Sequence, residues 1–456
     1  MTEGDDSAAT GGERSVESTQ SKGDDSAATG GERSVESTQE TRYTIISADA
    51  HAGLPCEEYR PYLDSRYLPQ FDAFLAERQA NRDEQMVLNY DYITNWETTH
   101  EEGLRGAYDP AQRDKEMDAD GVAAEVIFPD ADAITGMESP PFGAGLSAGM
   151  IEDPELAFAG ARAHNRFLVE LCAESPERRA GIGLVPICHD VERAVSEIEW
   201  LADKPGIGGI MVPTMWRDHP PYNDPSYDPV WAACQAAALP VHTHSGEAPR
   251  EEMNEFIGIY LAEVVFWTHR PISHLLFSGA FERFPGLKFV VTEGACYWVA
   301  DMKWKWDQYF GGGHTTKKMA ALMTGILSKL PSEYFGANIF VGASTMSKEE
   351  IRRRHTIGCD VAMWGTDYPH PEGTWPHTIA RLRSDFGDVP VGDTRKLLGE
   401  TAAKCYGFDL GALRPIAERI GPTPDDLGQD AGLVTSPDEI RRAEWWKDEY
   451  HVAWSG

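Results

Sequence analysis

The chain has 456 residues, of which 41% are hydrophobic and 25% are charged, a globular composition with enough length for a large core. It carries 74 acidic and 41 basic residues, so its formal net charge is −33. Such a surface repels nucleic-acid phosphates and anionic lipids, which argues against nucleic-acid binding and membrane binding.

The seven cysteines are scattered along the chain, and none belongs to a C-x-x-C pair. That pattern is typical of a reduced cytoplasmic protein with free thiols. No apolar stretch approaches the roughly 20 residues that span a bilayer, and no secretory signal is visible at the N-terminus. We therefore expect a cytoplasmic protein.

Residues 4–20 recur identically at residues 23–39. The repeat is polar and rich in Gly and Ser, so it cannot bury enough apolar surface to offset its ordering entropy. We expect residues 1–40 to form a disordered acidic tail. A recent duplication or a cloning artefact explains the repeat, and a targeting or cargo-docking peptide is the alternative.

From residue 43 onward, apolar runs alternate with amphipathic stretches. The predicted strands are 43–48, 122–129, 180–186, 207–213, 239–243, either 274–278 or 287–292, 338–343 and 361–366. The predicted helices are 154–175, 190–203, 228–238 and 393–406. A strand followed by a helix, about eight times, predicts an α/β fold, a (β/α)8 TIM barrel over residues 41–409. Sites in that fold lie at the C-terminal ends of the strands.

Two segments fall outside the barrel repeat. Residues 54–116 are too long for a simple first connection, and we expect them to form a helical cap or loop insertion over the barrel mouth. Residues 410–456 should form a C-terminal arm with three tryptophans, Trp445, Trp446 and Trp454. These rings would pack on a neighbouring subunit of a homodimer or higher homo-oligomer, or on the chain's own barrel.

Asp49 and His51 close the first apolar run. Because alternate residues of a strand face the same side, the two side chains project together as an oxygen and a nitrogen ligand for one divalent metal. At residues 239–246 the chain reads Leu-Pro-Val-His-Thr-His-Ser-Gly. Only His244 sits at that strand end, so we expect it to bind the metal, with His242 a deeper core residue or a hydrogen-bonding partner of the ligands.

Carboxylates end two further runs, Glu293 after the sixth and Asp367 after the last. Asp367 could bind the metal and take a proton from metal-bound water, or it could cap the next helix. Together with Asp49, His51 and His244 it makes a nitrogen and carboxylate set that suits one divalent metal, zinc foremost, with manganese as the alternative.

Four further residues are candidates for contact with a small-molecule substrate. His370 lies in a Pro-rich loop over the mouth, where it donates to the substrate or only packs the loop. Candidate aromatic residues lining the mouth are Trp216, Trp298 and Trp375.

The chain resembles the amidohydrolase superfamily, specifically the branch of aminocarboxymuconate semialdehyde decarboxylase. The resemblance covers about residues 43–409 and rests on these motifs: ISADAH at 46–51, MDADGVAAEVIFP at 117–129, YNDPSYDPVWAACQAAALPVHTHSG at 222–246, SGAFERFPGLKFVVTEG at 278–294, WGTDYPHPEGTWP at 364–376 and KLLGETAAKCYGF at 396–408. It implies a distorted barrel with one divalent metal. By position it implies ligand roles for Asp49, His51, His244 and Asp367.

Three features qualify this resemblance. Binuclear relatives carry a bridging Lys at the end of the fourth strand, where this chain has Met211-Val-Pro-Thr, so one metal is favoured. The first ligand is Asp49 where many members have His. Glu293 stands where the better-characterised decarboxylases carry a His, so it could be a fifth ligand, an acid or base, or a partner of a substrate amine or an Arg.

Three functions fit these residues. The first is a metal-dependent hydrolase, in which metal-activated water attacks a small aromatic or carboxylated substrate, Asp367 takes the proton and Glu293 orients or protonates. The second is a non-oxidative metal-dependent decarboxylase, a carboxy-lyase. The third is an inactive barrel with an assembly role, against which the intact ligand positions argue. The missing histidine after the sixth strand favours the hydrolase.

Overall fold

The computed structural model describes residues 42–132, 138–254, 256–311, 316–444 and 446. The chain divides into two units, residues 1–39 and 40–456, and every described residue belongs to the second unit. The predicted tail lies outside the described residues, as do Trp445 and Trp454.

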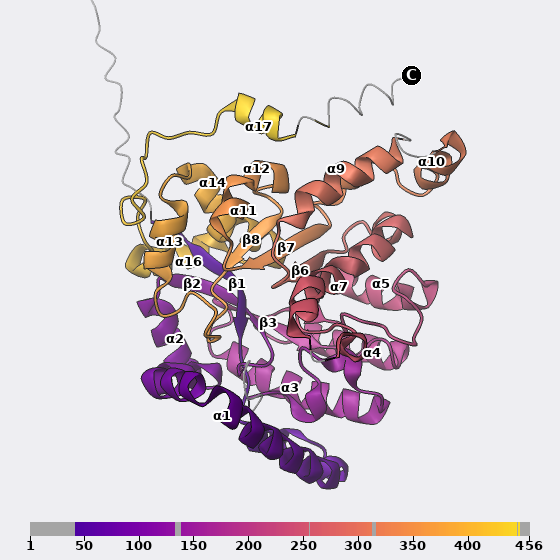
Figure 1. Cartoon of the computed structure of the whole chain (residues 1–456), viewed down its shortest axis with the longest axis vertical. Helices are drawn as coiled ribbons and strands as arrows, with labels where there is room; N and C mark the ends of the chain where they lie inside the picture. The colour runs from indigo at the N-terminus through magenta and orange to yellow at the C-terminus, as the bar shows by residue number, and fades with distance from the viewer. Residues whose placement is uncertain (1–41, 133–137, 255, 312–315, 445, 447–456) are drawn as a thin grey trace, which may run out of the picture. The chain divides into compact units, whose positions relative to one another are not determined.

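Eight parallel strands pair in chain order, each with the next. They are β1 (Ile45–His51), β2 (Val122–Phe128), β3 (Arg179–Leu184), β4 (Ile207–Met211), β5 (Val241–His244), β6 (Phe289–Thr292), β7 (Ile339–Ser344) and β8 (Ala362–Gly365). They lie at the centre of Figure 1, with α3, α4, α5 and α7 around them.

The last strand returns to the first. Ala50 forms a parallel bridge with Tyr368, and the Asp367 backbone N–H donates to the Asp49 carbonyl over 2.9 Å. Gly365 permits this approach, since a Cβ there would lie 2.8 Å from the Cβ of Asp49. The sheet is thus a nearly closed (β/α)8 TIM barrel, which confirms the predicted fold.

The helices between the strands begin at capping residues and bury one face. Asp153 caps α3 (Pro154–Ala173) and accepts from two backbone N–H groups of the first turn, and Asp190 caps α4 (Val191–Ala202) and accepts from the Arg193 N–H. Ile198 of α4 is fully buried in the main core together with Ile210 of β4. The other helices that follow strands are α5 (Asp228–Ala237), α6 (Arg250–Met253), α7 (Ile257–Phe277), α8 (Ala280–Arg283), α9 (Trp298–Phe310), α10 (Lys317–Thr324), α11 (Lys348–Arg352), α12 (Arg354–Ile357) and α13 (Thr378–Phe386).

Two predicted elements differ from the structure. The candidate strand 274–278 is wrong, because these residues end α7 and the sixth strand is the other candidate run. Three apolar residues in a row fit a helix end as well as a strand, and here the helix already runs from Ile257. The predicted helix 393–406 is divided into α14 (Val391–Arg395), a π-helical turn (Lys396–Glu400) and α15 (Thr401–Tyr406).

The long segment after β1 contains three short 3₁₀ turns, α1 (Leu68–Leu104) and α2 (Pro110–Ala119). Near the C-terminal end of α1, Trp96 packs against Trp375 in the loop after β8, with ring centroids 5.8 Å apart. This segment therefore contacts a loop at the barrel mouth.

The C-terminal arm contains α16 (Leu410–Ile420) and α17 (Pro437–Ala443). Trp446 is buried, and its indole N–H donates to Asp307 of α9 over 3.3 Å. Of the two alternatives for the arm, Trp446 therefore packs on its own barrel. Among the helices that the structure describes, none has the length and hydropathy of a membrane span.

Candidate metal centre

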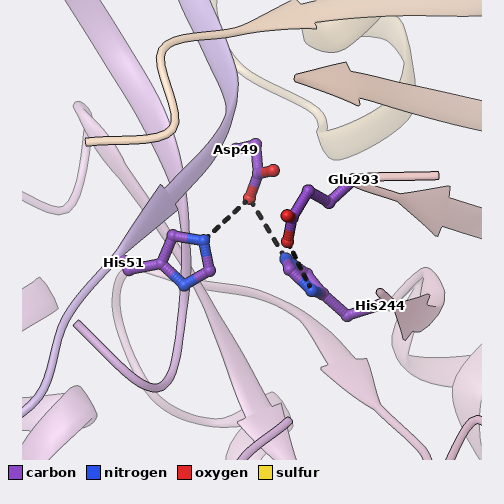
Figure 2. A group of neighbouring side chains, drawn as sticks. All are labelled: Asp49, His51, His244 and Glu293. Carbon is purple, nitrogen blue, oxygen red and sulfur yellow. Dashed lines mark hydrogen bonds and ion pairs between the residues drawn. The ribbon is translucent and has the colours of Figure 1, made fainter. Parts of the chain in front are cut away.

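The fully buried end of β1 supplies the centre of the site. The Asp49 carboxylate oxygen Oδ1 lies 3.6 Å from Nε2 of His51 and 3.4 Å from Nε2 of His244. Figure 2 shows this carboxylate between the two imidazole rings, with Glu293 beside His244. As expected for alternate positions of a strand, Asp49 and His51 face the same space.

His51 is held as a neutral imidazole. Its Nδ1 lies 2.7 Å from the Pro129 carbonyl, so Nδ1 carries the hydrogen and Nε2 keeps a free lone pair. Burial, followed by the neighbouring His370, lowers the pKa of His51. A neutral ring with a backbone acceptor on its far nitrogen is the usual form of a metal-binding histidine.

His244 and His242 differ although they belong to the same short strand. Nδ1 of His244 lies 3.0 Å from the Ser245 carbonyl and 3.3 Å from Glu293 Oε2, which leaves Nε2 directed at Asp49. Burial alone would lower the pKa of His244, but the carboxylates, Asp49 first, raise it to about 9. His242 has partners on both nitrogens, the Ile210 carbonyl at 2.9 Å and the Tyr406 hydroxyl at 3.1 Å, and burial lowers its pKa to about 3. His242 is thus a satisfied core residue.

The backbone adopts left-handed conformations just after β6 and β8. Glu293 has φ = 52° and Asp367 has φ = 61°, values that residues other than glycine rarely adopt. Such strain persists where the surrounding structure holds it, and it gathers at functional sites. Here it lies at two of the carboxylates that the sequence singles out.

Asp367 and His370 form a buried pair over β8. Asp367 Oδ1 lies 3.1 Å from His370 Nδ1 and 3.2 Å from His51 Nε2. Although burial opposes both effects, the pair lowers the pKa of Asp367 well below its usual range and raises the pKa of His370 to about 10. His370 Nε2 donates to the Asp130 carbonyl over 2.8 Å, and its ring stacks on His51. The pair therefore carries a proton at neutral pH.

Glu293 stands at the more open edge of the cluster, with 28% of its side chain exposed. Enclosure of the carboxyl group, followed by repulsion from Asp367 and Asp49, raises the pKa of Glu293 to about 8. Its ligand atom also falls in a group with those of Asp367 and the exposed Glu372.

The residues present fit a divalent metal. Asp49, His51, His244 and Glu293 each offer one ligand atom within 4.8 Å of the others, and a second such group, His51, Asp367 and His370, shares His51. Within the described part of the chain, three buried atoms have no partner with hydrogen-bond geometry: His51 Nε2, Asp367 Oδ1 and His370 Nδ1, of which the last two face each other as an ion pair. Buried polar atoms without partners are costly, and a cation between them would satisfy the two acceptors, His51 Nε2 and Asp367 Oδ1.

The three candidate tryptophans are buried among other side chains. Trp216 packs against His274 with centroids 4.5 Å apart, Trp298 against His269 at 4.4 Å, and Trp375 against Tyr368 at 5.0 Å. They therefore help to shape the loops around the mouth. Their contact with a substrate stays a prediction.

Sequence reasoning missed one direct neighbour of the cluster. The Ser344 hydroxyl, on the last residue of β7, donates to Asp49 Oδ2. Its place at a strand end is the signal that could have identified it, because Ser is otherwise too common to stand out.

The amidohydrolase family profile matches residues 112–408, well over half of the chain. The chain belongs to the amidohydrolase family. It is 23% identical over 259 residues to 2-amino-3-carboxymuconate-6-semialdehyde decarboxylase of Dictyostelium discoideum, covering 56% of this chain and 68% of that protein. It is 26% identical over 243 residues to gamma-resorcylate decarboxylase of Rhodococcus jostii, covering 48% and 69%. These relatives place the chain, an enzyme, in the branch that its motifs predict.

Solved structures share the fold. The 5-carboxyvanillate decarboxylase of Sphingomonas paucimobilis matches with a TM-score of 0.56 and 22% identity over 80% of this chain and 100% of that one. A dihydroxybenzoic acid decarboxylase from a Polaromonas species matches with a TM-score of 0.53 and 18% identity, covering 80% and 97%, and its structure holds manganese and the inhibitor 2-nitroresorcinol. The sequence expectation of a divalent metal agrees with this neighbour, while zinc in particular has no such support.

Proposed function

We propose that this enzyme is a non-oxidative, metal-dependent carboxy-lyase that removes CO2 from a small aromatic or similarly unsaturated carboxylic acid. One observation carries the proposal: both curated relatives are decarboxylases by name. The proposal therefore prefers the second of the functions that fit the sequence over the hydrolase.

The Asp367–His370 pair suits the proton balance of this reaction. The bond between the carboxylate and its carbon breaks, CO2 leaves, and the electron pair left on that carbon forms a new C–H bond. That bond needs one proton at a fixed place. The pair stores a proton between atoms 3.1 Å apart, and the Asp130 carbonyl holds the far side of the His370 ring.

The metal would be held by Asp49 and by Nε2 of His51 and His244, with Asp367 directed at the same space. When bound, a divalent cation supplies positive charge that holds the substrate carboxylate and a neighbouring oxygen in place. Glu293 would then act on His244, accepting its Nδ1 hydrogen and fixing the ring, as carboxylates commonly do for metal-binding histidines.

For the metal itself we propose manganese. Carboxylate oxygens suit Mn²⁺, imidazole suits several metals, and no thiolate is directed into the cluster of described residues. Elemental analysis of purified enzyme should give about one manganese per chain. Zinc at that stoichiometry would restore the sequence expectation, and two metals per chain would contradict both.

We also retain the homo-oligomer as a proposal. The start of α7 and the residue before it are exposed although they are apolar: the exposed fractions of Phe256, Ile257 and Leu261 are 66%, 63% and 64%. Such a surface is typical of a protein–protein interface. Light scattering on the full chain should give a dimer or larger species.

The reaction can be tested with three acids. One, 2-amino-3-carboxymuconate-6-semialdehyde, is named by a relative, and two, 5-carboxyvanillate and 2,6-dihydroxybenzoate, are named by decarboxylases of similar structure, the last from Rhizobium. The manganese-loaded enzyme should release CO2 from at least one of them. In D2O the product should gain one deuterium where the carboxylate stood. Hydrolysis of an ester, amide or lactone, without CO2 from any of these acids, would support the hydrolase instead.

A further inference from the structure

One side of the metal centre is apolar. The Phe128 ring, at the end of β2, lies 4.8 Å from the His244 ring between centroids. Phe128 belongs to a buried cluster with Leu184 and Met211, which end β3 and β4. A ligand held at His244 would therefore meet an apolar wall on this side.

Residues 141–151 cover that wall. Ala144, Ala148 and Ile151 of this segment, with Leu184 and Met211, line a cavity of about 10 Å³. Such a volume holds at most one water molecule. This cavity is too small for an aromatic ring, so a ring that lies between the segment and Leu184 requires the segment to move outward.

Glu247 fixes it. This residue follows His244 by three positions and is 2% exposed. One carboxylate oxygen accepts the Gly149 backbone N–H, and the other accepts the Met215 backbone N–H over 2.7 Å. A single carboxylate thus joins the covering segment to the loop after β4.

A second carboxylate holds the same segment nearer its start. Asp130 Oδ2 accepts the Leu146 backbone N–H, and the Asp130 carbonyl accepts from His370. The covering segment is therefore joined to the β5 loop behind His244 and, through Asp130, to the proton-carrying pair.

The charge on Glu247 is costly to bury. Burial is the main influence on its carboxyl group, and it raises the pKa of Glu247 to about 7 despite the opposing N–H groups. The nearby cation, Arg217, is paired with Glu251 at 3.0 Å. The two backbone hydrogen bonds are then the principal compensation, which ties the position of Glu247 to that of the segment.

We propose that Glu247 is a positioning residue that latches residues 141–151 over the apolar side of the site, where the small side chains of Ala144 and Ala148 set the size of the substrate's uncharged ring. The ring subsite, the space beside Ala144 and Ala148, rests on the proposed function. The latch, the contact of Glu247 with residues 141–151, does not.

Hydrogen exchange of the metal-loaded full chain tests the latch. In Glu247→Gln, an amide NH2 replaces one acceptor, so amides in 141–151 and 214–217 should exchange about tenfold faster, as expected when a hydrogen bond worth about 1.5 kcal/mol is lost. Glu252→Gln, an exposed acid nearby, is the matched control and should change neither segment. Metal content should stay constant in both.

Unchanged exchange in the two segments, or faster exchange spread evenly over the barrel, would overturn the latch. If Glu247→Gln does not fold, Glu247→Asp, which keeps the charge but cannot reach both loops, should show the same localised increase. These outcomes do not depend on which reaction the enzyme catalyses.

A size series tests the ring subsite. Ala148→Leu should raise KM for 5-carboxyvanillate about tenfold more than for the smaller 2,6-dihydroxybenzoate, because added methyl groups in a closed apolar pocket cost roughly 1–3 kcal/mol. Equal effects on both acids would overturn the size filter. If neither acid reacts, the same comparison by equilibrium binding of the two acids decides it, so failure of the proposed reaction remains separate.

Discussion

The two sides of the barrel mouth both consist of residues at strand ends, but one side is polar and the other is apolar. The polar side carries Asp49, His51, His244, Glu293 and Asp367 at or just after the ends of β1, β5, β6 and β8. The apolar side carries Phe128, Leu184 and Met211 at the ends of β2, β3 and β4. Leu184 and Met211 on the apolar side line a cavity of only about 10 Å³, whereas the polar side buries atoms that have no hydrogen-bond partner among the described residues.

The apolar side therefore contributes mainly to stability, and the polar side mainly to function. Filling apolar space stabilises a barrel, whereas each buried polar atom left without a partner costs roughly 1–3 kcal/mol. We infer that the polar side is kept for what it binds. Changes on the polar side should therefore abolish chemistry or metal binding, and changes on the apolar side should chiefly alter stability and fit.

The largest effect is expected at Asp367. Asp367→Asn keeps an oxygen of similar size but breaks the proton-carrying pair with His370, so turnover should fall about 10²- to 10⁴-fold. Much of the metal should remain bound. Asp360→Asn, an exposed acid just before β8, is the control and should leave turnover unchanged. Near-normal activity of a metal-loaded Asp367→Asn enzyme would show that the pair does not handle the proton.

The two histidines of β5 allow a metal ligand and a core residue to be compared within one strand. His244→Gln should weaken metal binding by at least about 10²-fold. Loss of a residue that only supports a ligand already costs about 10- to 100-fold, and loss of the ligand itself should cost at least as much. His242→Gln should keep the metal and lower the melting temperature, since it disturbs two buried hydrogen bonds. Metal titration and thermal melts of both variants measure this, and metal loss in the His242 variant alone would reverse their assigned roles.

Much of the fold could be predicted because most strands are apolar runs with a helix behind them. The sixth strand was ambiguous, since residues 274–278 have the same apolar character as a strand. The sequence of helix α1 shows no apolar periodicity over its 37 residues, so no pattern marks it as a helix. Local pattern was therefore insufficient where tertiary contacts decide the element.

The site was predictable only in part. Strand ends identified Asp49, His51, His244, Glu293 and Asp367, since the fold gathers those ends together. The sequence could not reveal that the backbone carbonyl of Asp130 would accept a hydrogen bond from His370. Nor could it reveal that the Glu247 carboxylate would bind two loops. Contacts with backbone groups depend on where loops lie, and loop sequences such as Gly145-Leu-Ser-Ala-Gly carry no periodicity that would place them.

Glu293 should show an intermediate effect. Glu293→Gln replaces the carboxyl group beside Nδ1 of His244 with an amide, so kcat should fall more than about tenfold, as for other partners of metal ligands. Because we assign it to orient His244, metal content should hold. A matching loss of metal would make Glu293 a ligand, and unchanged kcat and metal content would place it outside the site.

In the metal-free protein the polar side should make stability depend on pH. The pKa values of His244 and His370 are raised to about 9 and about 10, so both contribute stability below pH 6.5 that is lost as pH rises through 9 to 10. Metal binding has the opposite dependence, because it needs His244 deprotonated. Thermal melts at pH 6 and pH 9, with and without a chelator, should show a larger stabilisation by metal at pH 9. A larger stabilisation at pH 6 would contradict this charge arrangement.

The smallest effect is expected on the apolar side, at Phe128. Phe128→Leu removes part of a ring that touches His244 but supplies no ligand atom, so metal content should not change. The free energy of unfolding should fall by about 1–3 kcal/mol, as for other large-to-small core substitutions. Phe289→Leu, at a fully buried position of β6 in the main core, is the matched control and should cost a similar amount. If Phe128→Leu alone also lost its metal, the apolar wall would be part of what holds His244 in place, and the division between the two sides of the mouth would not stand.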